Sequence, residues 1–277
     1  MGLRIATNTQ SIAAQRNLGI NSASQKASLE KLASGARITR AADDAAGLAI
    51  SEKMRANIRS IRQDVRNAND GISMIQTAEG GMSEVGNILV RFRELSTQAA
   101  SDTLSNTERG FIDKEVKQLA AEVNRISSVT EFNGHKLLNG TGDMMEIQVG
   151  LGNDPENDRF QYAPEKTNVS LDHLGLSGIS VADKSSAQEN LGKIDEAIKV
   201  LSENRAELGA LQNRFQSSVN SMNVYDENLS AARSRIADVD MASETAELTK
   251  DNILSQAGVS VLSQANQNNM MALKLIG

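Results

Sequence analysis

This chain has very few prolines, and their positions constrain the fold more than any other feature of the sequence. The two prolines, Pro155 and Pro164, lie in one ten-residue stretch, so 154 residues precede it and 113 follow it without a proline. Proline breaks helices because it lacks the backbone N–H and its ring clashes with the preceding turn. We therefore predict two long helical arms joined by a short, turn-rich middle, and not an alternating α/β sheet.

Composition excludes several classes of protein. The chain has no cysteine, which argues against a disulfide scaffold and a cysteine-based zinc site. Only 3% of its residues are aromatic, so we do not expect a single thick enzyme core. The net charge of −6 does not favour nucleic-acid binding. No apolar run is long enough for a membrane span, and the first residues lack the apolar segment of a cleaved secretory signal.

Apolar residues recur every three or four positions over residues 187–236, which predicts one helix of about 75 Å at about 1.5 Å per residue. Matching apolar seams run over residues 61–92 and 112–126. Ser105 and Glu108 form a capping-box pattern ahead of the last of these. Helices with matching seams predict a mainly α fold, a long antiparallel bundle or coiled coil.

The hydrophobic period changes between residues 131 and 183. Residues 146–149 and 160–163 alternate apolar and polar side chains, and the segment between them is dense in turn formers. We interpret this region as small β-hairpins at one end of the bundle. For residues 164–170 a disordered linker is the alternative, although Ile179 indicates more ordered chain beyond it.

The two ends of the chain have helical composition but thin apolar seams. Small and amide side chains stand where a self-sufficient core has Leu or Ile, so neither end buries enough apolar area to offset its ordering entropy. The simplest partners for such ends are other copies of the same chain. The candidate assembly residues are Ile5, Leu18, Leu29, Leu32, Leu254, Val261, Ala265 and Leu275.

Candidate catalytic and metal-binding residues find little support, and we predict neither an enzyme nor a cofactor. His135 and His173 lie in the turn-rich middle without a metal-binding spacing. The Asp43-Asp44 pair favours the start of a helix, because helix N-termini stabilise carboxylates. Asp238-Val239-Asp240 lacks the glycine and glutamate of a calcium loop. Gly80-Gly81 follows no strand, and we interpret it as a local kink and not as a phosphate loop.

Arg91, Glu94 and Leu95 are spaced by three and four residues and so share one face of a helix, whereas Phe92 belongs to the apolar seam. A surface patch that binds a partner and a simple solvated charged face both agree with this spacing.

Six segments in order along nearly the whole chain carry a resemblance to a known family. They are residues 34–50, 66–73, 91–99, 131–134, 231–240 and 256–267. Together they resemble bacterial flagellin. Ala36 and Thr39-Arg40 depart mildly from the usual pattern, at the junction between arm and bundle. Many flagellins insert variable outer domains in the middle of the chain, so this sequence resembles a short form without them.

The resemblance implies a structural subunit of the flagellar filament that polymerises through its terminal helices into a helical tube for swimming motility. A hook–filament junction protein, which shares the terminal arms, is the alternative. Residues 1–42 and 235–277 are implied to pair as helices that line the inner tube and are disordered in the free monomer. Residues 43–234 are implied to form the outer-tube domain, with β-hairpins at about 131–183.

The resemblance also implies an extracellular protein exported through the flagellar type III apparatus without a cleaved signal peptide. The implied partners are further copies of the chain, an export chaperone, and the filament cap and hook-associated proteins. Flagellins that are similar over residues 91–95 are recognised by Toll-like receptor 5, and the matching positions here are Arg91, Leu95 and Glu115. The same surface is expected to contact a neighbouring subunit in the filament.

Overall fold

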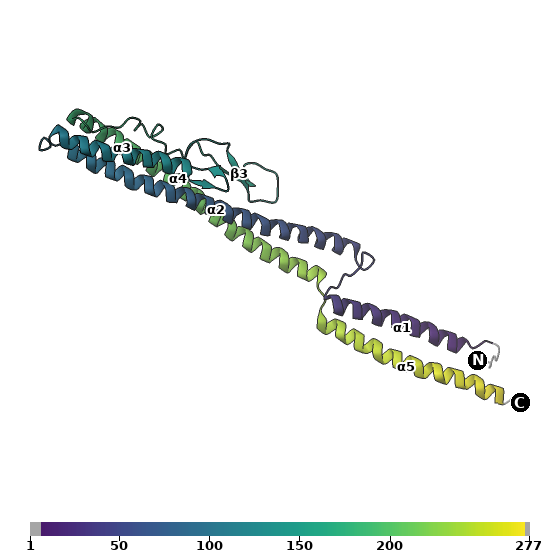
Figure 1. Cartoon of the computed structure of the whole chain (residues 1–277). Coiled ribbons are helices and arrows are strands. Elements are labelled where there is room, and N and C mark those ends of the chain that lie inside the picture. Colours follow the sequence, from purple (N-terminus) through teal and green to yellow (C-terminus); the bar gives the residue numbers. More distant parts are fainter. Residues whose placement is uncertain (1–6, 275–277) are drawn as a thin grey trace. The chain divides into compact units, whose positions relative to one another are not determined.

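The computed structural model describes residues 7–274, with side chains up to residue 267, and it is mainly helical (Figure 1). Two small antiparallel sheets lie between the third and fourth helices along the chain. The helices of the described residues are α1 (Thr9–Ser34), α2 (Ala45–Ala99), α3 (Asn106–Val129), α4 (Lys184–Ala237) and α5 (Met241–Lys274). The predicted mainly α fold is therefore confirmed.

Two helix starts follow the signals in the sequence. Asp44 stands directly before α2, and its Oδ1 accepts a hydrogen bond of 2.8 Å from the backbone N–H of Gly47. Asp43 accepts backbone hydrogen bonds in the preceding turn, which lower the pKa of its carboxyl group. The capping box of α3 is present, since Ser105 accepts from the N–H of Glu108 and Glu108 accepts in return.

The described chain divides into two compact units. One contains the residues up to Ile58 and those from Glu227 onward, and the other is Arg59–Asp226. Both α2 and α4 pass from one unit to the other. The assignment of residues 1–42 with 235–277 to an inner tube, and of residues 43–234 to an outer tube, stays a prediction.

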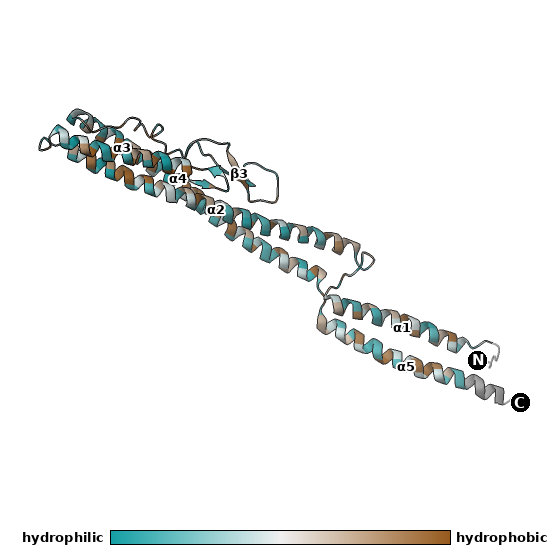
Figure 2. Ribbon diagram, in the orientation of Figure 1, coloured by the Kyte–Doolittle hydropathy of each residue, from teal (hydrophilic) through white to brown (hydrophobic). Residues whose placement is uncertain are grey.

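Within Arg59–Asp226, α2 and α4 pair along their apolar seams. Ion pairs join the two helices near both ends of this stretch, Arg62 with Asp226 at 2.9 Å and Arg93 with Asp195 at 2.7 Å. The core contains Met82, Val85, Leu89 and Phe92 of α2, Val116 and Val123 of α3, and Ile194, Leu201 and Phe215 of α4. Figure 2 shows apolar and polar residues interspersed along the helices. No helix within residues 7–274 has the length and hydropathy that crossing a membrane requires.

Two hairpins follow α3. β1 (Glu131–Phe132) and β2 (His135–Lys136) are joined by a two-residue turn in which both Asn133 and Gly134 have positive φ. β3 (Met145–Gln148) pairs with β4 (Arg159–Tyr162). Phe160 of β4 meets Phe215 of α4 edge to face at 4.8 Å, which fastens this hairpin to the bundle. The predicted hairpin region is confirmed, with strands displaced by one residue.

The chain after β4 is ordered, so the alternative of a disordered linker at residues 164–170 is wrong. Thr167 is buried and donates a hydrogen bond of 2.9 Å to the carbonyl of Leu137. The N–H of Val169 donates to the carbonyl of Leu138, also at 2.9 Å. Tyr162 donates to the carbonyl of Leu137, and burial raises the pKa of its hydroxyl to about 12.

Candidate assembly surface

The N- and C-terminal helices α1 and α5 lie side by side (Figure 1). α1 is capped by Asn8, whose side chain accepts from the N–H of Ser11, and it ends at Gly35 in the left-handed region. Polar contacts that run in antiparallel order join the helices: Asn8 with Ala265 at 3.0 Å, Gln25 with Asn252 at 2.5 Å and Lys31 with Glu244 at 3.8 Å. The predicted pairing of the two terminal helices is confirmed.

The fully buried side chains of the α1–α5 pair are small or polar. The buried side chains of the described parts of these helices are Ser11, Ala14, Ser28, Asp251 and Ala265. A Cβ on Gly258 would lie 3.0 Å from Leu18 Cδ2, so this glycine allows the two helices to approach closely. The contact therefore contains little of the large aliphatic area that stabilises the bundle between α2 and α4.

Most of the large aliphatic side chains described in α1 and α5 are instead exposed, whereas Leu18, Leu32, Leu248 and Leu262 are half-buried. Their exposed fractions range from 42% for Leu254 to 61% for Ile20 and Ile253. The exposed Ile, Leu and Val residues within the described side chains of these helices are Ile12, Ile20, Leu29, Ile253, Leu254, Val259 and Val261. Exposed aliphatic side chains on these two helices leave apolar area that a partner protein could cover.

A hollow of about 380 Å³ opens between the ends of the two helices. Its lining is mostly small or amide side chains, with one aliphatic: Gln10, Ala13, Ala14, Asn17, Val261, Gln264 and Ala265. The surface of the pair thus offers both projecting aliphatic side chains and a recess of a size that could admit one.

A second candidate surface surrounds Arg91 on α2. Its guanidinium donates to Glu94, one turn along α2, and to Glu115 of α3, each at 2.9 Å. Both hydrogen bonds raise the pKa of Arg91, and the one to Glu94 has the larger effect. All three side chains are exposed, whereas Leu95 is only 1% exposed. Leu95 lies in the core with Phe92 and is not available at the surface.

Two models of one protein family match the chain. The model of the bacterial flagellin N-terminal helical region matches residues 5–143, and that of the bacterial flagellin C-terminal helical region matches residues 191–276. The chain belongs to the bacterial flagellins.

Flagellin relatives of similar length align with almost the whole of this chain. The flagellin of Halalkalibacterium halodurans is 45% identical over 269 residues, which are 97% of this chain and 98% of that protein. The flagellin of Bacillus subtilis is 43% identical over 92% of this chain and 93% of its own length. The flagellar filament 33 kDa core protein of Treponema phagedenis is 42% identical over 97% and 98%. This flagellin is thus a filament subunit of the short form, a structural protein and not an enzyme.

Solved structures agree with this assignment. The crystal structure of Bacillus cereus flagellin has a TM-score of 0.52 and 30% identity, covering 57% of this chain and 88% of that one. A putative flagellar hook-associated protein from Vibrio parahaemolyticus has a TM-score of 0.54 at 14% identity, covering 71% and 100%. The second likeness concerns the fold alone, so the comparisons favour flagellin over the alternative of a hook–filament junction protein.

The predicted assembly residues of this flagellin fall into three groups. Leu29, Leu254 and Val261 are exposed on the helix pair. Leu18 and Leu32 are half-buried, and Ala265 is buried where its carbonyl accepts from Asn8. Ile5 and Leu275 lie outside the described residues.

Sequence reasoning missed four exposed aliphatic residues: Ile12, Ile20, Ile253 and Val259. It followed one period of three and four residues along each end of the chain, and these four residues lie outside the set that this period selects. Large aliphatic side chains outside the seam of a helix were the signal that could have found them.

Proposed function

We propose that this flagellin assembles through the outer faces of α1 and α5, with residues 1–42 and 235–277 forming the inner tube and residues 43–234 the outer tube. The observation that carries the proposal is that the fully buried side chains of this helix pair are small or polar, whereas most of its large aliphatic side chains are exposed. An exposed aliphatic face is stabilised when another subunit covers it. A contact between two different faces produces an open helical filament when the rotation between successive subunits does not close a ring.

The energy available from this face is sufficient to control assembly. Burying a whole Leu or Val side chain contributes about 1.5–3 kcal/mol, so burying the exposed half contributes about 1 kcal/mol. Leu254 and Val261 are 42% and 58% exposed, so together they would contribute about 2 kcal/mol per subunit. A change of about 1.4 kcal/mol is tenfold in an equilibrium constant, so losing both should raise the critical concentration about 30-fold.

The test is a Leu254→Gln, Val261→Gln double variant, compared with Leu254→Met, Val261→Ile, which keeps both side chains apolar. Seeded polymerisation of purified monomer gives the critical concentration, and circular dichroism checks that each monomer is helical. The glutamine variant should polymerise only at much higher concentration, and the conservative variant should behave like the parent. If the glutamine variant is helical and polymerises at the parent's critical concentration, the proposed surface is wrong.

The same surface accounts for the remaining proposed partners. Before export, the exposed aliphatic residues of α5 need a cover, and we assign that role to an export chaperone that binds the C-terminal arm. Export through the flagellar type III apparatus, without a cleaved signal, would deliver the chain to the extracellular filament. At the filament ends, where no further flagellin covers this face, the cap and hook-associated proteins would bind it.

The exposed Arg91–Glu115 pair is the proposed contact for a neighbouring subunit and for Toll-like receptor 5. Arg91, Glu94 and Glu115 together offer one guanidinium and two carboxylates on α2 and α3. Arg91→Ala should weaken activation of receptor-bearing cells, whereas Arg125→Ala, which removes another exposed arginine of an ion pair, should not. Equal activation by the parent and by Arg91→Ala would remove the receptor from the proposal.

A further inference from the structure

A buried carboxylate interrupts the apolar seam of α2. Asp64 stands between Ile61 and Ala68, which are 1% and 0% exposed, and is itself only 6% exposed. Its Oδ2 has no hydrogen-bond partner within the described chain. A carboxylate that loses its water without gaining a hydrogen bond or a counter-charge is costly, so this position calls for an explanation.

The β3–β4 hairpin brings a turn onto this part of α2. Ile147 lies against Gly71, where a Cβ would come within 3.3 Å of Ile147 Cδ1. The next residue, Gln148, accepts a hydrogen bond of 3.2 Å through its carbonyl from the side chain of Asn67, one turn earlier on α2. Asp64 is one further turn along the same face. The chain that follows β3 therefore passes over Asp64.

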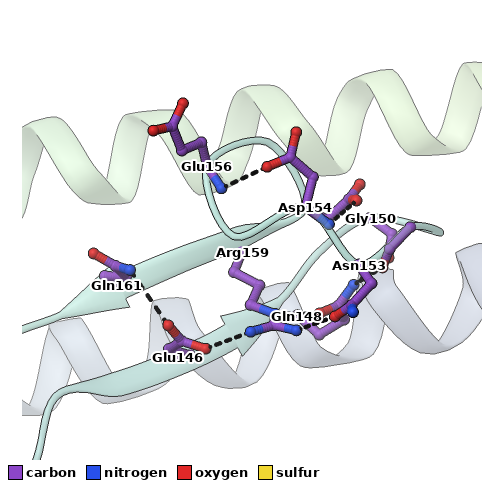
Figure 3. A network of polar contacts seen from close by, with 10 residues as sticks. Glu146, Gln148, Gly150, Asn153, Asp154, Glu156, Arg159 and Gln161 are labelled. Atoms are coloured by element: carbon purple, nitrogen blue, oxygen red, sulfur yellow. Dashed lines mark hydrogen bonds and ion pairs between the residues drawn. The ribbon is translucent and has the colours of Figure 1, made fainter.

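That turn is folded around a second carboxylate, Asp158. A Cβ on either Gly150 or Gly152 would collide with the Asp158 carboxyl group, so the turn needs glycine at both positions. Asp158 Oδ2 accepts from the N–H of Asp154 at 3.0 Å. Arg159, the next residue, turns away into the network around Gln148 (Figure 3). Glycines thus bring the backbone of the turn directly against this carboxyl group.

The charge of Asp158 acts on Asp64, and neither carboxyl group has a cation within the described residues. Burial raises the pKa of Asp64, and the negative charge of Asp158 raises it further. Within residues 7–274 no ion pair reaches Asp64 or Asp158. The cationic side chains nearest to them in sequence are engaged elsewhere: Arg62 with Asp226, Arg66 with Gln63 and Arg159 with Glu146.

We propose that Asp64, Asp158 and carbonyl oxygens of the turn 149–158 form a cation site that takes Ca²⁺. Calcium is bound by carboxylate, carbonyl and water oxygens in flexible geometry. Its charge would compensate both carboxylates and hold the hairpin on α2. No group of three or more His, Cys, Asp or Glu side chains suited to a metal occurs among the described residues. With only two carboxylates, the site falls in the weak range of extracellular calcium modules, Kd about 10⁻⁴–10⁻³ M.

The experiment uses the full-length monomer at neutral pH and constant ionic strength. Calcium chloride is titrated calorimetrically, and thermal unfolding is followed with and without calcium. The parent should bind one Ca²⁺ per chain, and calcium should raise its unfolding midpoint. Asp64→Asn should bind at least ~10-fold more weakly, because it removes one of the two anionic ligands. Asp143→Asn removes an exposed carboxylate shortly before β3 and should bind like the parent.

Two results would overturn the site. Calcium that shifts the parent, Asp64→Asn and Asp143→Asn equally would be acting on surface charge in general. A parent that binds no calcium would reject the site. If its unfolding midpoint also falls as the pH rises through the raised pKa of Asp64, while that of Asp64→Asn does not, Asp64 carries a proton instead. If Asp64→Asn does not fold, Asp158→Asn provides the same comparison, and calcium binding to it as tight as to the parent would equally reject the site.

Discussion

Two adjacent glycines of α2 should respond in opposite directions to the same substitution. No atom lies within 4 Å of the place where a Cβ on Gly80 would stand, whereas a Cβ on Gly81 would lie 2.7 Å from Leu138 Cδ1 and 2.8 Å from Thr130 Oγ1. Replacing glycine by alanine inside a helix stabilises it by about 1 kcal/mol. At Gly81 this gain is outweighed by overpacking, which costs about 1–3 kcal/mol, because Leu138 is fully buried and has no space to move into.

Urea unfolding of the monomer, followed by far-ultraviolet circular dichroism, measures both changes. Gly80→Ala should raise the free energy of unfolding by up to about 1 kcal/mol, and Gly81→Ala should lower it by about 1 kcal/mol. Each variant is the control for the other, since both add one methyl group to the same turn of α2. If both variants shift the free energy in the same direction, the chain around Leu138 does not pack on α2 as described.

Three further predictions concern single side chains. Tyr162→Phe removes a buried hydrogen bond and should lower the free energy of unfolding by about 1–2 kcal/mol in urea; an unchanged value would contradict the described contact. Burial alone raises the pKa of Asp113, but hydrogen bonds from Lys117 and Ser180 outweigh it, so the pKa is lowered on folding. The ionised Asp113 carboxylate therefore stabilises the fold at neutral pH, and this stabilisation is lost as the pH falls through the folded pKa. Asp113→Asn should flatten the decline in the free energy of unfolding below about pH 4; the same decline in the parent and the variant would contradict this. Arg93→Ala breaks an exposed ion pair with α4 and should cost no more than about 1 kcal/mol, less in high salt; a larger, salt-independent loss would contradict a purely electrostatic role.

Much of the fold could be predicted because its helices repeat one local signal many times. The apolar seam at residues 187–236 became α4, Lys184–Ala237, and Ser105 and Asp44 begin their helices as expected. Residues 164–170 were harder, since their order comes from Thr167 and Val169 bonding to carbonyls about 30 residues earlier. The composition of a short segment does not reveal hydrogen-bond partners that lie so far away along the chain.

The candidate surfaces were predicted less completely. The spacing predicted that Leu95 lies on the same exposed face as Arg91. In the structure Arg91 pairs with α3 and Arg93 pairs with α4, so α2 has a neighbouring helix on each side. Leu95 is buried as a result. A single periodic seam does not reveal a second neighbour. At Asp64 the sequence shows only one charge in an apolar pattern, and its significance appears only when the hairpin turn lies over it.

A cryo-EM map of the assembled filament tests the central claim most directly. The measured quantity is the exposed area of Ile20, Ile253, Leu254 and Val261, compared with the single chain, in which their exposed fractions are 42–61%. We predict that neighbouring subunits bury these side chains almost completely, in an inner tube built from α1 and α5. A filament in which they remain exposed, with its subunit contacts confined to Arg59–Asp226, would contradict the account.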